Sequence, residues 1–320
     1  MKLLVRWGKL GFSLLMLLVV LYVSNPGHLL PALLQADAEL LLVGVGLWGL
    51  IQALNVYKWY LLNRAQGLHV SYRQLFNIYF IGMFFNTFLP SGFGGDAVRA
   101  YQLARLTRQG GTSTASVILD RMTSLYALLL LATVALSFAP KALQVIPVSW
   151  MLGLDLLGAL AFYVLLQPSW LMHVLRFPWV ARSEKIRAFI EEVASSTLSL
   201  GAATRIFLIT LGISLVFQFL GAVEHHFFLR ALGITTPFAS TALFFPILTI
   251  VSSLPISVNG LGLREGGWVY FLGTLGVARE DAVLVGLISF SMLLLSGIWG
   301  AFVYMGARRK PQKPLMGPEG

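Results

Sequence analysis

The sequence predicts an all-α, polytopic membrane protein. Of its 320 residues, 57% are hydrophobic and only 11% are charged, whereas about 25% of the residues of a soluble domain carry a charge. So few charged side chains could not cover a water-facing surface of this size. Composition therefore argues against a soluble enzyme, a nucleic-acid-binding protein and a disordered scaffold.

Apolar stretches divide the chain into predicted membrane spans. A helix needs about 20 apolar residues to cross the bilayer, and six stretches meet this length: 8–24, 40–62, 113–138, 148–167, 205–232 and 282–305. Two further apolar regions, 74–108 and 238–276, are each interrupted by Pro and Gly. We expect the span 8–24 to be a retained anchor, because no cleavage site of small residues directly follows it.

The basic residues predict the orientation of these spans. Of the 23 Lys and Arg residues, 17 fall in five clusters outside the central parts of the spans: Lys2–Lys9, Lys58–Arg73, Arg105–Arg108, Arg176–Arg205 and Arg308–Lys313. Because basic loops stay on the cytoplasmic side, we expect these clusters and both termini to be cytoplasmic.

The same rule constrains the two interrupted regions. If each crossed the membrane once, the basic segment 168–204 would lie outside. We therefore predict two re-entrant helical hairpins, with 74–108 entering from the cytoplasm and 238–276 from the opposite side. The alternative is two ordinary kinked spans. Either way, residues 1–307 form a single transmembrane domain and 308–320 form a disordered cytoplasmic tail.

The interrupted regions share a pattern that predicts an inverted repeat. Leu89–Arg99 and Leu254–Arg264 both fit Leu-Pro-x4-Gly-x3-Arg. In each case a long span precedes the hairpin and another follows it, with opposite orientation, so that 40–138 and 205–305 are the two repeats. Spans 8–24 and 148–167 are additions to them. Inverted repeats whose broken helices meet near the midplane are typical of secondary transporters.

The two hairpin tips are the predicted binding site. Irregular backbone at membrane depth is tolerated only inside protein or beside a water-filled cavity. Each tip precedes a new helix, whose N-terminus favours an anion, and a guanidinium recognises phosphate or carboxylate in a bidentate manner. The predicted ligands of a lipid head group are Arg99, Arg264, Asn86, Ser91, Gly94, Gly95, Asn259 and Gly260.

Acidic residues near the tips are predicted partners of these arginines or coupling groups. Asp96, Glu265 and Asp120 are the candidate partners, and Arg121 follows Asp120 in the next span. Glu224 is a candidate proton carrier in span 205–232. The simpler alternative is that these charges only hold the hairpins in place, because a buried charge at membrane depth usually has a partner.

No sequence motif indicates catalysis, a metal or a cofactor. The chain has no Cys, which removes thiolate nucleophiles and cysteine metal sites. It lacks a phosphate-binding G-x-x-x-x-G-K-[ST] loop, H-E-x-x-H and G-x-S-x-G. The adjacent His225 and His226 point about 100° apart on a helix and make a poor metal pair. We therefore expect no catalytic residue, no metal site and no cofactor.

The segment NTFLPSGFGGDAVR, from Asn86 to Arg99, resembles the signature of a bacterial and archaeal family. This is the lysylphosphatidylglycerol synthase transmembrane region, also called the flippase-like domain family. Asp120-Arg121 and the segment NGLGLREG from Asn259 are similar to its other motifs, and the resemblance covers about residues 10–305. Members move aminoacylated phospholipid between leaflets or are associated with hopanoid or polyprenyl-linked lipids. Full synthases add a soluble aminoacyl-transfer domain that is not expected here.

The resemblance and the tips together lead to one primary hypothesis. The chain is expected to be a lipid translocase of a prokaryotic inner membrane, with an anionic or zwitterionic lipid as its partner and no nucleic acid. Its head group would enter a polar cavity between the tips. The rivals are a membrane-embedded enzyme acting on a lipid-linked sugar or lipid phosphate, and an accessory subunit. A second copy of the chain or a pathway enzyme are the protein partners considered.

Overall fold

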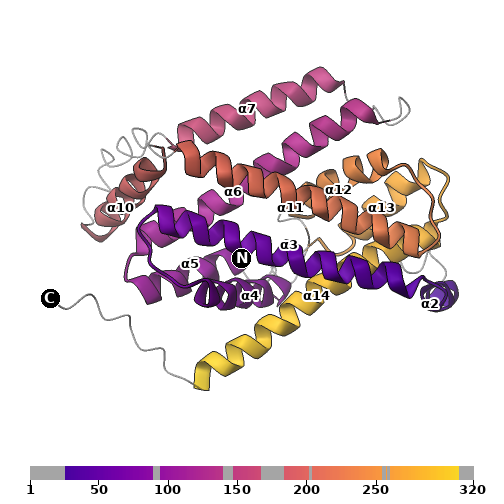
Figure 1. Cartoon of the computed structure of the whole chain (residues 1–320), viewed down its shortest axis with the longest axis horizontal. Coiled ribbons are helices and arrows are strands. Elements are labelled where there is room, and N and C mark those ends of the chain that lie inside the picture. Colours follow the sequence, from indigo (N-terminus) through magenta and orange to yellow (C-terminus); the bar gives the residue numbers. More distant parts are fainter. Residues whose placement is uncertain are drawn as a thin grey trace, which may run out of the picture.

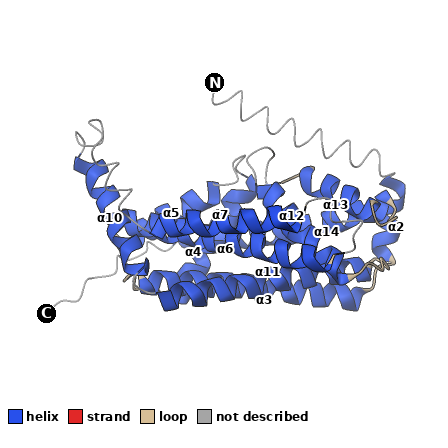
Figure 2. Ribbon diagram, turned by 90° about the horizontal axis from the view of Figure 1, so that it is seen from above, coloured by secondary structure: helices blue, strands red, loops and turns tan. Residues whose placement is uncertain are grey.

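The computed structural model describes residues 26–88, 94–139, 147–166, 184–201, 204–253, 257 and 260–309, and most of these residues are helical. No strand occurs in these ranges, and Figure 2 shows the helices gathered in an elongated bundle. The all-α prediction is confirmed. The helices in chain order are α2 (Pro26–Leu34), α3 (Ala38–Ala65), α4 (Tyr72–Phe88), α5 (Gly94–Thr107), α6 (Gly110–Phe138), α7 (Val148–Leu166), α10 (Glu184–Gly201), α11 (Thr204–Ala231), α12 (Phe238–Ser253), α13 (Leu263–Gly273) and α14 (Arg279–Arg309).

Four of these helices, α3, α6, α11 and α14, are long and apolar enough to cross a membrane. They coincide with the predicted spans 40–62, 113–138, 205–232 and 282–305. The predicted span 148–167 is helix α7, but its apolar stretch, Val148–Val164, is shorter. The predicted span 8–24 and the tail beyond Arg309 lie outside the described residues.

Each interrupted region forms two shorter helices. The region 74–108 becomes α4 and α5, and the region 238–276 becomes α12 and α13. Even α4, with 17 residues, reaches only about 26 Å at 1.5 Å per residue, less than the thickness of the hydrocarbon core. The partners of each pair pack against each other. The two pairs lie toward opposite ends of the bundle (Figures 1 and 2).

The two halves of the chain contact each other reciprocally. Each half contains a long helix, two short helices and a second long helix, in that order. The first long helices, α3 and α11, pack along each other, while α4 packs on α14 and α12 packs on α6. One apolar core, around Trp59, lies within the first half, whereas the core around Trp268 combines the helices of the second half with the end of α6 and with α7. The interior between the halves is therefore lined by helices from both.

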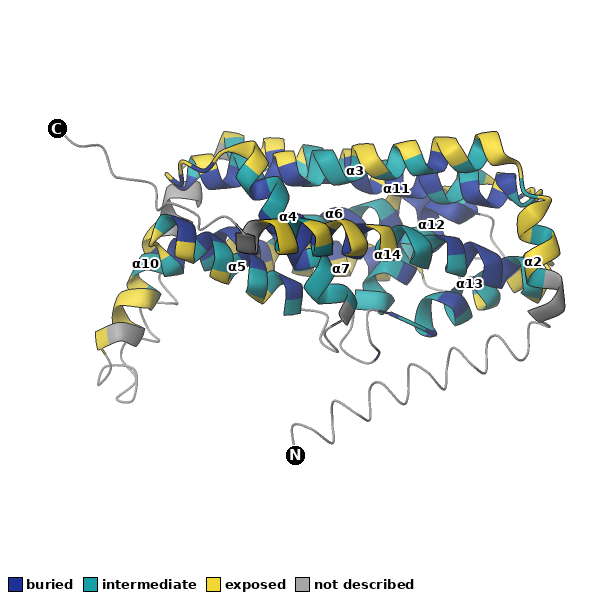
Figure 3. Cartoon of the chain, turned by 90° about the horizontal axis from the view of Figure 1, so that it is seen from below, coloured by how far each residue is buried: buried dark blue, intermediate teal, exposed yellow. Residues whose placement is uncertain are grey.

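The outer face of the bundle is apolar. Large hydrophobic side chains lie exposed along the helices, among them Leu42 on α3, Leu156 on α7 and Phe302 on α14. Figure 3 shows this for α3, with exposed residues along its outward side and buried residues along its inward side. So large an exposed apolar surface is unusual for a soluble protein and suits contact with lipid.

Candidate functional site

A cluster of buried ion pairs joins three helices of the first half. The carboxylate of Asp120, on α6, accepts Nη2 of Arg99 from α5 at 2.8 Å and pairs with Nζ of Lys58 from α3 at 2.9 Å. The Lys58 ammonium also donates to the carbonyl oxygen of Asp120 at 2.9 Å and to Oγ of Ser124 at 2.6 Å. A buried ion pair is strong when further hydrogen bonds satisfy its remaining atoms. The Lys58 ammonium makes such bonds, whereas Nε of Arg99 has no hydrogen-bond partner among the described residues.

Arg99 also contacts a second carboxylate and an aromatic ring. Its Nη1 lies 3.3 Å from Oδ1 of Asp96, one turn earlier on the same helix. Its guanidinium carbon lies 4.2 Å from the ring centre of Trp59, which is a favourable cation–π distance. The other oxygen of Asp96 lies 3.8 Å from Nε of Arg121. Asp96 and Asp120 are thus partners of Arg99, as predicted among the alternatives, and Glu265 is not.

Lys58 is the residue whose place the sequence analysis misjudged. It was counted in the cytoplasmic cluster Lys58–Arg73, yet its side chain is 0% exposed. It lies seven residues before the end of α3, about 10 Å along the helix axis, and points inward rather than toward the membrane surface. Its position within the apolar stretch 40–62 was the available signal. Its partner, 62 residues away, could not be read from local sequence.

The first tip is held together by the residues that were predicted to bind a ligand. The N–H of Gly95 donates to Oδ1 of Asn86 at 2.7 Å, which ties the start of α5 to the end of α4. A Cβ atom on Gly95 would collide with the carbonyl oxygen of Gly82. Gly94 begins α5, and Ser91 lies outside the described residues. The N–H of Gly95 is therefore occupied by the protein itself.

The second tip closes in a different way. The carboxylate of Glu265 accepts the N–H of Gly262 at 2.6 Å and so caps the start of α13. Gly260 has φ +75° and lies against the side chain of Ser252, a conformation and a closeness that suit glycine. Asn259 lies outside the described residues. Here too, an N–H group expected to face an anion is bonded within the protein.

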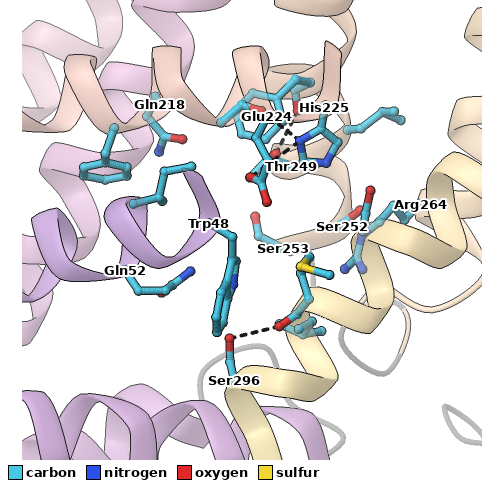
Figure 4. A pocket seen from close by; sticks show the side chains of 18 of the residues that line it. Trp48, Gln52, Gln218, Glu224, His225, Thr249, Ser252, Ser253, Arg264 and Ser296 are labelled. Atoms are coloured by element: carbon cyan, nitrogen blue, oxygen red, sulfur yellow. Dashed lines mark hydrogen bonds and ion pairs between the residues drawn. The ribbon is translucent and has the colours of Figure 1, made fainter. Parts of the chain in front are cut away.

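A central cavity of about 330 Å³ lies between the halves. Its wall takes residues from α3, α4, α6, α11, α12, α13 and α14. Figure 4 shows side chains of both polar and aromatic type around this space, including Trp48, Glu224, Thr249, Ser253 and Arg264. The volume lies within the usual range for a small-ligand site.

A smaller cavity of about 240 Å³ adjoins the central one. It is lined by Asp96, Arg99 and Asp120, and it shares Asn86 and Arg121 with the central cavity. The side chain of Arg121 is 31% exposed and that of Arg99 is 7% exposed. Of the predicted arginines in the first half, Arg121 is therefore the one that an incoming ligand can reach.

One part of the wall of the central cavity is formed by Glu224 together with the rings of His225 and Trp268. Glu224 is 5% exposed, and its carboxylate oxygen Oε2 lies 4.0 Å from Nδ1 of His225. His225 Nδ1 lies 2.8 Å from the carbonyl oxygen of Gly221, and its ring stacks on that of Trp268. Within the described parts of the chain, no group of three or more metal-ligating side chains occurs.

Comparison with known proteins gives a family for this arrangement. The sequence profile of the lysylphosphatidylglycerol synthase transmembrane region matches residues 6–300. The chain belongs to this family. A relative from Methanothermobacter thermautotrophicus, a UPF0104 membrane protein, is 26% identical in an alignment of 316 positions that covers 91% of this chain and 93% of the relative. No solved structure matches the chain. The protein is therefore a multi-pass membrane protein of the family that the tip motifs indicated.

Proposed function

We propose that the protein translocates a polar-headed lipid between the leaflets of the membrane. The head group enters the central cavity while the acyl chains stay in the bilayer. The observation that carries this proposal is the cavity itself, a space walled by seven helices from both halves of a membrane protein and lined by charged, polar and apolar side chains. Sites between the repeats of secondary transporters are built in the same way.

Arg121 and Arg264 are the proposed ligands of the lipid phosphate. Both line the central cavity, one from the first half and one from the second. Guanidinium groups recognise phosphate through two parallel hydrogen bonds. Arg99, by contrast, is 7% exposed and already paired with two carboxylates. We therefore assign Arg99 to holding α5 against α6, which revises its expected role as a direct ligand.

The two halves supply the means of alternating access. In this proposal they form an inverted repeat, and the cavity opens first toward one leaflet and then toward the other. The matching element order and the reciprocal packing of α4 on α14 and of α12 on α6 support it. The basic clusters support cytoplasmic termini.

Exchange of labelled lipid in proteoliposomes tests the proposal. Purified protein is reconstituted with acyl-chain-labelled phospholipid, and a membrane-impermeant quencher reports how much lipid reaches the outer leaflet. We expect rapid exchange by the wild type and a loss of at least about tenfold in the double variant Arg121→Gln, Arg264→Gln. The matched control is Arg230→Gln, at an exposed arginine of α11.

Two results would overturn the proposal. One is exchange that the double variant leaves unchanged. The other is chemical conversion of the lipid by the purified protein, which would favour the membrane-embedded enzyme. Exchange that appears only together with a co-purified partner would instead indicate an accessory subunit.

A further inference from the structure

The charged groups around the two cavities balance one another. Among the described residues, three basic and three acidic side chains line them: Arg99, Arg121, Arg264, Asp96, Asp120 and Glu224. Lys58, which pairs with Asp120, and Glu265, which follows Arg264, add one further charge of each sign. The undescribed tip residues 89–93, 254–256 and 258–259 add no ionisable side chain. With every group ionised, the empty interior is neutral, and a singly anionic head group would give it one negative charge.

Glu224 differs from the other three carboxyl groups. Asp96 and Asp120 each pair with at least one basic side chain, and Glu265 accepts a backbone N–H. The carboxylate of Glu224 instead lies 4.0 Å from Nδ1 of His225. Because a carbonyl oxygen only accepts, the 2.8 Å contact with Gly221 places a hydrogen on that Nδ1. Neutralising Glu224 thus breaks no ion pair with an arginine or lysine shown in the described structure.

Of the ionisable groups on the wall of the central cavity, Glu224 is the one best placed to gain or lose a proton. Helices α3, α4, α12 and α14 pack around the central cavity and contribute only uncharged side chains to its wall. Besides Glu224, the ionisable groups on the wall of the central cavity are Arg121 from α6, Arg264 from α13 and His225, which is adjacent to Glu224. No charged residue of α10 lines this cavity. Arginine stays protonated at all relevant pH values. The His225 ring is held by Gly221 and by stacking on Trp268.

We propose that Glu224 takes up one proton whenever the cavity admits a singly anionic head group, and releases it with the lipid on the other side. The proton adds to a carboxylate oxygen from water on the loading side, so the empty and the loaded cavity are both neutral. The physical reason is the cost of carrying net charge through the hydrocarbon core. This inference rests on the proposed lipid translocation and gives it an electroneutral mechanism.

Proton flux measured beside lipid exchange tests the inference. Proteoliposomes containing a trapped pH dye and acyl-labelled phosphatidylglycerol, a singly anionic lipid, are assayed at about pH 6 and about pH 8. For the wild type we expect faster exchange at the lower pH, about one proton moved per lipid, and no response to a potassium diffusion potential. Phosphatidylcholine, which is zwitterionic, should move without a proton.

Substitution of Glu224 separates coupling from transport. Glu224→Gln mimics the protonated carboxyl, so exchange of phosphatidylglycerol should continue without proton flux or pH dependence and should become sensitive to the membrane potential. Glu224→Asp keeps a titratable group and should keep the proton flux, even if packing lowers the rate. Glu39→Gln, at an exposed acid of α3, is the matched control.

The outcomes distinguish this inference from the proposal beneath it. If the wild type exchanges no lipid, the translocase proposal fails and the coupling mechanism fails with it. If the wild type exchanges phosphatidylglycerol without proton flux, and Glu224→Gln behaves identically, only the coupling is overturned. If Glu224→Gln abolishes exchange of phosphatidylcholine alone, Glu224 instead binds the cationic part of a head group, which also overturns proton coupling.

Discussion

The two hairpin tips have the same Leu-Pro-x4-Gly-x3-Arg pattern but use their arginines differently. In the first tip, Asp96 lies three residues before Arg99 and pairs with it. In the second tip, Glu265 directly follows Arg264 and turns back to the N–H of Gly262. Side chains three apart share a helix face, whereas adjacent ones point about 100° apart. The position of the acidic residue relative to the arginine therefore determines whether the two side chains form an ion pair within the tip.

This difference gives the two halves different tasks. Arg99 closes a buried network that locks α5 to α6 and, through Asp120, to Lys58 on α3. Arg264 lines the central cavity from α13. A repeated motif thus supplies a structural cation in one half and a proposed ligand in the other. The comparison teaches that two segments with the same short motif can use the shared arginine in different ways.

The largest expected effect is in the first half, at Asp120. Asp120→Asn leaves Lys58 and Arg99 buried beside a neutral amide, so we expect the free energy of unfolding to fall by about 3–5 kcal/mol. Denaturant unfolding of the protein in mixed micelles measures it. Lys58→Met added to Asp120→Asn should recover part of the loss, because one unpaired cation is removed. A single variant within about 1 kcal/mol of the wild type would contradict the network.

A smaller loss of stability is expected where α4 and α5 meet. Gly95→Ala places a methyl group against the carbonyl oxygen of Gly82 and the side chain of Asn86, and overpacking of this kind costs about 1–3 kcal/mol. Gly266→Ala is the control in the second half, since nothing lies within 4 Å of its added methyl group. It should be neutral or slightly stabilising, because alanine favours a helix. Equal losses in both would contradict the close packing.

The functional contrast between the tips is tested with the two arginines themselves. Arg264→Gln should slow lipid exchange about tenfold, which corresponds to about 1.4 kcal/mol. Arg99→Gln should act mainly on stability, because its partners Asp96 and Asp120 would lose their cation. Exchange is normalised to folded protein, and unfolding is measured separately. If Arg264→Gln unfolds as easily as Arg99→Gln while exchange is intact, the assignment of roles is wrong.

The smallest expected effect is at the cap of α13. Glu265→Ala removes the acceptor for the Gly262 N–H and should cost about 1 kcal/mol of stability. Glu265→Gln keeps an oxygen at that place and should stay close to the wild type. If Glu265→Gln instead lost as much stability as Asp120→Asn, Glu265 would be part of a charge network like that of the first half.

Local sequence was enough to predict the four long helices and the two interrupted regions. Hydropathy predicted the four long helices, and Pro and Gly predicted that 74–108 and 238–276 each divide in two. Both are local properties of the chain. The pairing of Asp96 with Arg99, which is among the predicted alternatives, follows from a spacing of three residues. The cap that Glu265 forms on Gly262 has the same spacing, so it too could have been predicted. The predicted span 148–167 corresponds to α7, whose apolar stretch is shorter than those of the four long helices.

The partners of distant charges were not predictable in this way. Lys58 and Asp120 are 62 residues apart, and nothing local distinguishes a lysine that faces the interior from one that reaches the membrane surface. The same holds for the central cavity, whose wall unites Trp48 of α3 with Arg264 of α13. Such pairings depend on which helix faces meet.

The sequence by itself therefore determined that this is a helical membrane protein with two interrupted regions of matching pattern, because hydropathy and backbone preference act within a few residues. Only the tertiary structure decided that Arg99 is held in buried ion pairs and that Arg264 lines the central cavity. Packing brought Lys58, Arg99 and Asp120 together from three helices, while it left Glu224 and Arg264 on the wall of the same space. In a medium of low dielectric, the neighbours that packing supplies determine what each charge can do.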